Sequence, residues 1–172
     1  MEFSDVYDAS RMKTGKIIAR GEKDAEDEYE MIVNVCIFNS KNEMLIQKRH
    51  SSKTQWSNMW DFTVGGGVMA GETSQSGGER ECMEEIGCEI DLSGVRPHLT
   101  VAIGRGFEDI FLIERNLDIE TLKLQREEVQ AVKWATEQEI LSMADSGEFM
   151  AYYKELISLL FRMRHKYGNQ SR

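Results

Sequence analysis

The chain has 172 residues, of which 41% are hydrophobic, and it carries a formal net charge of −9. This length suits a single domain over residues 1–172 with an N-terminal extension over 1–29, because no Ser/Gly/Pro-rich linker or repeat divides it. The acidic balance argues against a binding surface for nucleic-acid polymers or anionic membranes. The sequence contains neither a signal-peptide pattern nor an apolar run long enough to span a bilayer, so we expect a cytoplasmic protein.

The first half of the chain predicts a β-hairpin followed by a helix. Residues 31–38 and 44–49 are rich in apolar and β-branched side chains, and turn formers separate them. Residues 59–64 predict another strand, which runs into three consecutive glycines. Thr73 is placed to cap a helix that ends at Gly87.

The second half predicts more strands and two helices. Strands over 98–103, 107–114 and 129–135 would complete a mixed sheet. The stretch "TEQE" from Thr136 has the form of a capping box and predicts a short helix. Apolar residues then recur at three- and four-residue intervals, which predicts a C-terminal helix over 148–166 packed on the sheet. The three cysteines have no zinc-like spacing, so we expect reduced thiols.

The stretch "GGERECMEEIGC" over residues 77–88 gathers four glutamates in one helix. At 100° per residue, Glu81, Glu84 and Glu85 fall within about 100° of arc. We expect the opposite face, formed by Cys82, Met83 and Ile86, to lie against the protein. Repulsion between like charges raises carboxylate pKa values and calls for a neutralising partner. Mg²⁺ or Mn²⁺ would suit these oxygen ligands, and a solvated acidic face is the alternative.

Gly77 and Gly78 flank the acidic face of this helix. Glycine costs about 1 kcal/mol relative to alanine in a helix interior. We therefore expect the two glycines to admit the close approach of backbone or of a ligand.

The spacing between residues 66 and 88 resembles the Nudix box, whose Gly, Glu and Arg positions are occupied here by Gly66, Glu72, Arg80, Glu81, Glu84, Glu85 and Gly87. The resemblance implies a single Nudix domain of the α/β (α+β) class, an α/β/α sandwich around a central mixed β-sheet. Residues 66–88 would form its loop-helix-loop. Cys82 and Cys88 depart from the larger aliphatic residues that the family usually has at these positions.

The same resemblance implies an activity and a site. The activity is hydrolysis of a nucleoside diphosphate linked to another moiety, and other diphosphate small molecules are possible substrates. Glu81, Glu84 and Glu85 would bind Mg²⁺ or Mn²⁺, while Arg80 and Glu72 would form a pair that orients the acidic helix. Nudix proteins do not all take the general base from one position. The base candidates are therefore Glu81, Glu84, Glu108, Asp109, Glu127 and Glu128.

Two further groups are candidates for substrate binding. Arg49 and Lys53 belong to a basic cluster that could meet phosphate oxygens, with a solvated strand end as the alternative. Trp56 and Trp60 could stack on a base, with buried anchoring of their loop as the alternative.

Residues 3–135 also resemble the Nudix branch that includes isopentenyl-diphosphate isomerases and related hydrolases. Those isomerases use a cysteine on the strand leading to the box, and the stretch "WDFTVGGG" has none. Hydrolysis is therefore the favoured reading over isomerisation. A non-catalytic module that binds a nucleotide or metabolite is a third reading. The sequence does not reveal the oligomeric state, and a homodimer is possible.

Overall fold

The computed structural model describes residues 2–20, 22, 26–168 and 170. A two-stranded hairpin comes first, formed by β1 (Phe3–Tyr7) and β2 (Lys13–Ala19). The strands of the main sheet are β3 (Glu30–Phe38), β4 (Glu43–Arg49), β5 (Trp60–Asp61), β6 (Val64–Gly67), β7 (Leu99–Ile103), β8 (Gly106–Glu114) and β9 (Val129–Thr136). The helices are α1 (Ser74–Ile86), α2 (Glu137–Ser146), α3 (Lys154–Met163) and the short 3-10 helix η1 (Ile119–Thr121). Within the described ranges, no helix has the length and apolar character needed to cross a membrane.

The main sheet is mixed, as the sequence predicts. Its strand order is β5-β4-β3-β8-β7, while β6 pairs with β3 and β9 pairs with β4. The central strands β3 and β8 run parallel, and the other pairs are antiparallel. Ile32 lies opposite Glu108 and Asn34 lies opposite Ile110 in the parallel pair.

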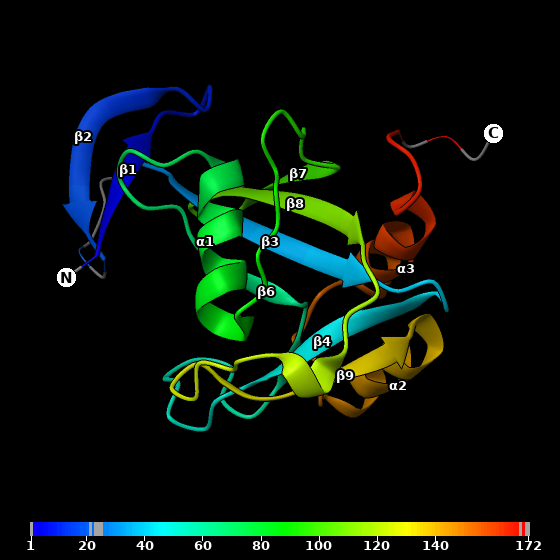
Figure 1. Cartoon of the computed structure of the whole chain (residues 1–172). Helices are drawn as coiled ribbons and strands as arrows, with labels where there is room; N and C mark the ends of the chain where they lie inside the picture. The colour runs from blue at the N-terminus through cyan, green and yellow to red at the C-terminus, as the bar shows by residue number, and fades with distance from the viewer. Residues whose placement is uncertain (1, 21, 23–25, 169, 171–172) are drawn as a thin grey trace.

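Alternate residues of β3 face two separate apolar layers. Val33 and Val35 belong to the layer that contains Cys82 and Ile86 of α1. Cys36 belongs to the other layer, with residues of α2 and α3. Because successive side chains of a strand point to opposite faces, α1 covers one face of the sheet and α2 with α3 covers the other (Figure 1). The predicted α/β/α sandwich is thereby confirmed.

Local sequence determines both ends of α1. Thr73 accepts a hydrogen bond from the Ser76 backbone N–H, and Gly87 ends the helix in the left-handed conformation with φ of 64°. The helix bounds predicted from these two caps are confirmed. The capping box of α2 at Thr136 is also confirmed.

The rotation of α1 about its axis differs from the prediction. Met83, which we expected to face the protein, is 48% exposed, whereas Glu85 is only 6% exposed. A Cβ on Gly78 would lie 3.1 Å from both Leu92 Cδ1 and Val35 Cγ2. The glycines therefore admit close approach of α1 to the sheet, and not of a ligand as the sequence left open.

Two other predicted elements have different bounds. The strand predicted over 59–64 is divided into β5 and β6, and the helix predicted over 148–166 is α3, which begins only at Lys154. The reason lies in β5. The Trp60 N–H donates to the Glu148 carbonyl and the Met150 N–H donates to the Trp60 carbonyl, both at 2.8 Å. These bonds, with the bridge between Trp60 and Phe149, hold the segment before α3 extended.

The N-terminal hairpin docks beside the loop that precedes α1, at the end of the molecule away from α3 (Figure 1). The Ala70 N–H donates to the Phe3 carbonyl, and the Gly71 N–H donates to Asp5 Oδ2, each at 2.8 Å. Lys13 Nζ donates to the Glu72 carbonyl at 2.9 Å. The hairpin thus contacts the same loop that carries the first acidic residue of the box.

Candidate active site

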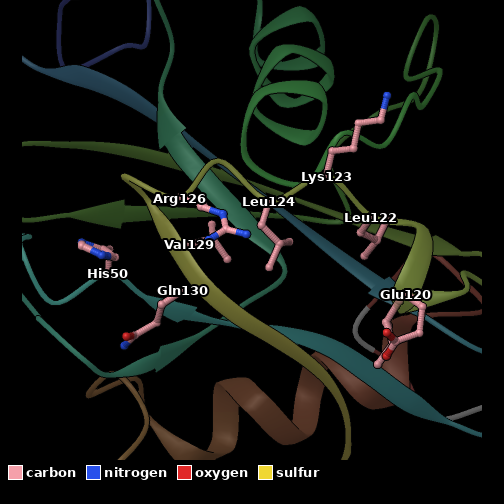
Figure 2. A pocket seen from close by; sticks show the side chains of 9 residues that line it. His50, Glu120, Leu122, Lys123, Leu124, Arg126, Val129 and Gln130 are labelled. Carbon is pink, nitrogen blue, oxygen red and sulfur yellow. The ribbon is translucent and has the colours of Figure 1, made fainter.

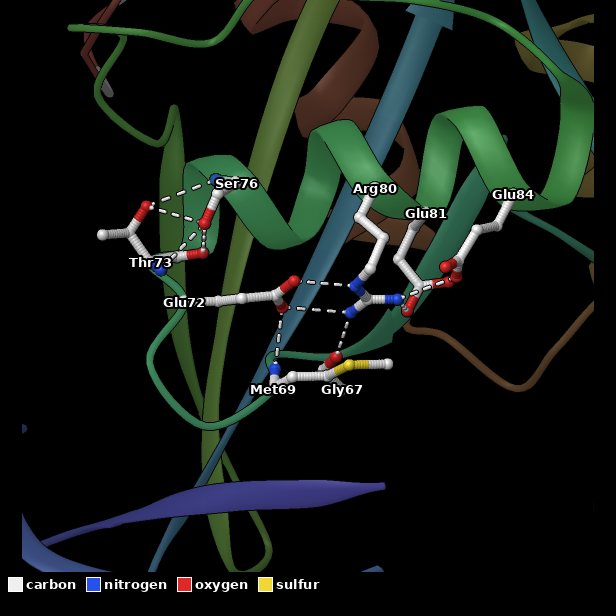
Figure 3. A network of polar contacts seen from close by, with 8 residues as sticks. All are labelled: Gly67, Met69, Glu72, Thr73, Ser76, Arg80, Glu81 and Glu84. Atoms are coloured by element: carbon white, nitrogen blue, oxygen red, sulfur yellow. Dashed lines mark hydrogen bonds and ion pairs between the residues drawn. The ribbon is translucent and has the colours of Figure 1, made fainter. Parts of the chain in front are cut away.

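Arg80 lies at the centre of a polar network on α1 (Figure 3). Its Nε donates to Glu72 Oε1 at 2.8 Å and its Nη2 donates to Glu72 Oε2 at 3.1 Å. Nη2 also donates to the Gly67 carbonyl at 2.9 Å. Glu72 Oε2 in turn accepts from the Met69 N–H at 2.8 Å. The predicted pair is thus a bidentate ion pair that joins α1 to the loop after β6.

The same guanidinium contacts two of the predicted metal ligands. Arg80 Nη1 donates to Glu81 Oε1 at 2.8 Å and to Glu84 Oε2 at 3.0 Å. Burial acts to lower the pKa of Arg80, but the hydrogen bond to Glu72 and the charge of Glu81 outweigh it and raise that pKa. Arg80 is therefore a permanent cation within the acidic cluster.

The Glu81 carboxylate packs directly on the backbone of β6. A Cβ on Gly66 would overlap this carboxylate, whereas a Cβ on Gly67 would meet nothing within 4 Å. Burial raises the pKa of Glu81 and Glu84 raises it further, while Arg80 opposes them. Glu81 can therefore occupy its position against β6 only because residue 66 is a glycine.

Glu85 is the most buried of the three carboxylates. Its Oε2 accepts a hydrogen bond from Gln47 Nε2 of β4 at 2.9 Å. Burial and the charge of Glu81 raise the pKa of Glu85 to about 8, although Gln47 acts in the opposite direction. The raised pKa therefore results first from burial and then from the neighbouring negative charge of Glu81.

A small cavity of about 100 Å³ brings most of the predicted residues together. It is lined by Arg80, Glu81, Glu84 and Glu85 from α1, and by Arg49, Lys53 and Glu128 from other parts of the chain. Lys53 and Glu128 form an ion pair. Burial and the neighbouring charge of Arg49 lower the pKa of Lys53. Acidic and basic side chains therefore line the same small space.

The donor set of this cavity fits a hard divalent cation. All three α1 groups are carboxylates, which Mg²⁺ and Mn²⁺ prefer, and two of them retain raised pKa values. Among the described residues, however, no three acidic, histidine or cysteine side chains already form a metal-ligand group. The reason is that Arg80 holds Glu81 and Glu84, and Gln47 holds Glu85.

A larger cavity of about 850 Å³ adjoins the small one. Gly65, Gly66 and Arg49 line both. Asp61 and Glu108 line the larger cavity while being only 7% and 6% exposed. Burial raises the pKa of each of these two carboxyl groups. The two cavities together form one cleft beside the acidic helix.

The remaining candidates for the general base lie in different places in the structure. Glu108 lines the larger cavity and Glu128 the smaller one, whereas Asp109 is held by Arg11, with Nη2 to Oδ2 at 2.9 Å. Asp109 and Glu127 line neither cavity.

Of the two tryptophans, only Trp56 lines the larger cavity. Trp60 lies instead beside two cations, with Lys133 Nζ 4.5 Å and Lys48 Nζ 5.9 Å from its ring centroid. The expectation that Trp60 binds substrate is therefore not supported, because this ring lies outside the cleft. Anchoring beside β4 and β9 is its observed environment.

The sequence did not predict several residues of the cleft. Gln47 and Asn34 are ordinary polar residues within strands, and no pattern in the sequence indicates that they belong to the site. Asp61 could have been found from the sequence, because a carboxylate inside the apolar run "MWDFTV" requires a partner or a function. Glu2 and Arg20, which form an ion pair, line both cavities from the N-terminal extension.

A third cavity, of about 620 Å³, is lined by a different set of residues (Figure 2). It is lined by His50, Ile119, Glu120, Leu122, Lys123, Leu124, Arg126, Val129 and Gln130, none of which lines the other two cavities. Figure 2 shows the Lys123 side chain pointing away from that of Arg126. The cations of this cavity therefore do not converge on one point.

A sandwich with an acidic loop-helix-loop beside a cleft defines the class of Nudix domains, and comparison with known proteins agrees. The family model of the NUDIX domain matches residues 28–156. A Nudix hydrolase of Listeria monocytogenes is 40% identical over 165 residues, which cover 96% of each chain. A solved structure from Deinococcus radiodurans has a TM-score of 0.71 over 94% of this chain and 98% of its own, and at 24% identity this likeness shows the fold alone. The chain belongs to the Nudix hydrolase family.

The isomerase branch gives a shorter match. An isopentenyl-diphosphate isomerase of Salmonella heidelberg is 37% identical over 65 residues, which cover 37% of this chain and 36% of that protein. The similarity is therefore partial, in contrast with the match over nearly the whole length of the Listeria hydrolase.

Proposed function

We propose that the protein is a Nudix pyrophosphohydrolase that cleaves a nucleoside diphosphate linked to another moiety, with Mg²⁺ or Mn²⁺ bound by Glu81, Glu84 and Glu85. Family membership supports pyrophosphate hydrolysis in general. One observation carries the finer proposal. The three carboxylates of α1 line a small cavity that the cations Arg49 and Lys53 also line. Such a cavity suits an anion that is bound both by cationic side chains and through metal ions.

Arg49 and Lys53 bind the diphosphate in this proposal. Arg49 lines both cavities, so its guanidinium can contact the phosphates while the rest of the substrate occupies the larger cavity. Burial and the charge of Arg49 lower the pKa of Lys53, and an anionic ligand between these two cations would relieve their repulsion.

The carboxylates have two separate tasks. Metal bound by the α1 glutamates would neutralise phosphate charge and lower the pKa of a water molecule. A carboxylate that lines the same cavity would accept the proton of that water, and among the base candidates Glu81, Glu84 and Glu128 line it. Arg80 and Glu72 act as positioning residues, since their ion pair sets the orientation of Glu81 and Glu84.

Isomerisation is not favoured by any of these observations. Cys36, Cys82 and Cys88 are buried, and none of them is among the described residues that line the two cavities of the cleft. The strand that leads to the box ends in glycines instead.

The direct test is phosphate or nucleotide release from a panel of nucleoside-diphosphate derivatives with Mg²⁺ or Mn²⁺. Glu84→Gln and Glu85→Gln should each lower the turnover number roughly 100-fold or more while the circular dichroism spectrum is retained. Glu89→Gln, an exposed residue just beyond α1, is the matched control and should keep full activity. Full activity in both test variants would refute the metal assignment. Tight binding without release would indicate a binding module, and double-bond migration in isopentenyl diphosphate would indicate an isomerase.

A further inference from the structure

The larger cavity of the cleft has a mixed lining that a diphosphate alone does not require. Its volume of about 850 Å³ falls within the range of roughly 300–1,000 Å³ that is usual for small-molecule sites. Apolar walls come from Ile32, Met69 and Ile103, and Trp56 lines the cavity with its side chain partly open, at 46% exposed. Such walls suit a flat organic group.

Set within these apolar walls are two carboxylates on different strands. Glu108 belongs to β8 and Asp61 to β5, and the negative charge of Asp61 acts on Glu108. Both are almost completely buried, yet both line the cavity. A buried carboxylate is costly unless hydrogen-bond donors surround it, so the available donors decide what these groups can bind.

The donors around Asp61 are already supplied by the protein. Its Oδ1 accepts from the Phe62 N–H at 2.8 Å and from the Tyr152 hydroxyl at 3.1 Å, and its Oδ2 accepts from Arg49 Nη1 at 3.3 Å. The ring of Tyr152 stacks on Phe62 with centroids 4.3 Å apart, which fixes the hydroxyl. Asp61 is thus a preorganised part of the wall.

Glu108 is different because its protein partners are fewer. Its Oε1 accepts a hydrogen bond from Asn34 Nδ2 across the β3–β8 pair. Within the part of the chain that the structure describes, Oε2 has no hydrogen-bond partner. Glu108 therefore lines the cavity with one carboxylate oxygen free to accept a hydrogen bond, although the residue is only 6% exposed.

We propose that Glu108, held by Asn34, recognises the amino group of a nucleobase, so that the enzyme prefers diphosphates of amino-bearing bases to those of uracil. This inference rests on the proposed function, because it identifies the moiety next to the hydrolysed diphosphate. Cytosine, adenine and guanine each present an exocyclic amino donor, whereas uracil presents a carbonyl oxygen at the position of the cytosine amino group. The Glu108 carboxylate and the uracil carbonyl oxygen are both acceptors, so they would repel each other. Each would also lose its hydrogen bonds to water without gaining a new one.

The test compares CDP-glucose with UDP-glucose, two substrates that share the diphosphate and the sugar and differ only in the base. Wild-type kcat/KM should favour CDP-glucose by about tenfold or more. Glu108→Gln keeps the shape of the side chain and adds a donor that can meet the uracil oxygen, so the ratio should fall towards one or invert. Glu114→Gln, on the same strand with its side chain 47% exposed, should keep the wild-type ratio.

Several outcomes would overturn the inference. Equal wild-type kcat/KM for the two substrates would do so, as would an active Glu108→Gln enzyme with an unchanged ratio. A preference that follows the ribose 2′-hydroxyl, measured with the deoxycytidine analogue, would assign the cavity to the sugar instead.

A separate binding measurement distinguishes failure of this inference from failure of the proposed function. Calorimetric titration of the metal-free wild-type protein with CMP and UMP requires no hydrolysis and no folded variant. Tighter binding of CMP with no turnover of any diphosphate would refute the proposed function and retain the base preference. Equal binding of CMP and UMP would refute the base preference even in an active hydrolase.

Discussion

Arg80 and Glu72 are joined by two parallel hydrogen bonds of 2.8 and 3.1 Å between side chains that are 17% and 20% exposed. Removing the charge of Glu72 should therefore weaken both the fold and the alignment of the acidic helix. We expect Glu72→Gln to lower the free energy of unfolding by about 2 kcal/mol and to reduce kcat more than it changes KM. Arg80→Lys should behave similarly, because an ammonium cannot make the bidentate contact.

Urea denaturation and steady-state kinetics would measure both effects. The matched control is Asp145→Asn, which breaks the ion pair with Lys154, whose side chains are 64% and 51% exposed. That loss should change stability little, because the pair is exposed to solvent, and it should leave kcat intact. Equal costs in the two variants would contradict the special role given to the Arg80 pair.

The contribution of Glu72 to the free energy of unfolding should also depend on pH. Burial acts to raise the pKa of Glu72, but the hydrogen bonds from Arg80 and from the Met69 N–H outweigh it, so that the pKa lies below its ordinary value of 4.5. The folded state then binds fewer protons than the unfolded state, and the stabilisation is present above pH 4.5 and lost as the pH falls through the lowered pKa. The difference in unfolding free energy between wild type and Glu72→Gln should be constant near neutrality and shrink below that pH. A difference that persists unchanged to pH 3 would exclude this linkage.

Gly66 and Gly67 offer a matched pair of substitutions in one strand. An alanine Cβ at position 66 would overlap the Glu81 carboxylate, whereas at position 67 it would meet nothing within 4 Å. Gly66→Ala should displace Glu81 and lower kcat by about 100-fold, the cost of roughly 1 Å of misplacement in an active site. Gly67→Ala should remain close to wild type in the same assay. Comparable activities of the two variants would show that Glu81 does not need its present position.

Gly78 should matter for stability through packing on the sheet. Leucine at this position would press on Val33, Val35 and Leu92, which already lie 3.1 to 3.3 Å from the place of a Cβ. We expect Gly78→Leu to lower the free energy of unfolding by about 3 kcal/mol, at the upper end of usual overpacking costs. Gly104→Leu, where a Cβ would meet nothing within 4 Å, is the control for the leucine itself. Unfolding midpoints in urea that coincide for both variants would refute the packing argument.

Arg49 and Asp61 should be coupled energetically. Arg49→Met leaves Asp61, which is 7% exposed, without its cation and should cost about 3 kcal/mol of stability. Adding Asp61→Asn should restore most of that stability, because the unpaired buried charge disappears. The double variant should nevertheless stay poorly active, since the cation that lines both cavities is gone. A double variant with wild-type kcat/KM would show that Arg49 serves only to neutralise Asp61.

The elements that could be predicted from the sequence are those determined by nearby residues. The bounds of α1 follow from Thr73 and Gly87, which lie at its ends, and the Glu72–Arg80 pair lies within the same loop-helix-loop. The rotation of α1 could not be predicted from its own pattern. It depends on the contact of Gly77 and Gly78 with β3, which buries Glu85 and exposes Met83.

The errors at the C-terminus and in the cleft have the same origin. The pattern from Phe149 onward has helical spacing, but Trp60, almost 90 positions earlier, holds the first part of it extended through backbone hydrogen bonds. The larger cavity likewise draws its wall from β3, β5 and β8, which no local pattern connects. Tertiary contacts of this kind override the propensity of a segment.

The parallel pairing of β3 with β8 has a consequence for the order in which the molecule is assembled. Asn34 and Glu108 are 74 positions apart, and a parallel pair cannot be closed by a tight turn. Contacts so distant in the chain carry a large loop-closure entropy and slow folding. During synthesis on the ribosome, residues 66–88 emerge well before β8, so a nascent chain already carries every acidic residue of the box while β3 still lacks its parallel neighbour. Maturation of the cleft must therefore wait until the later strand has been translated and docked.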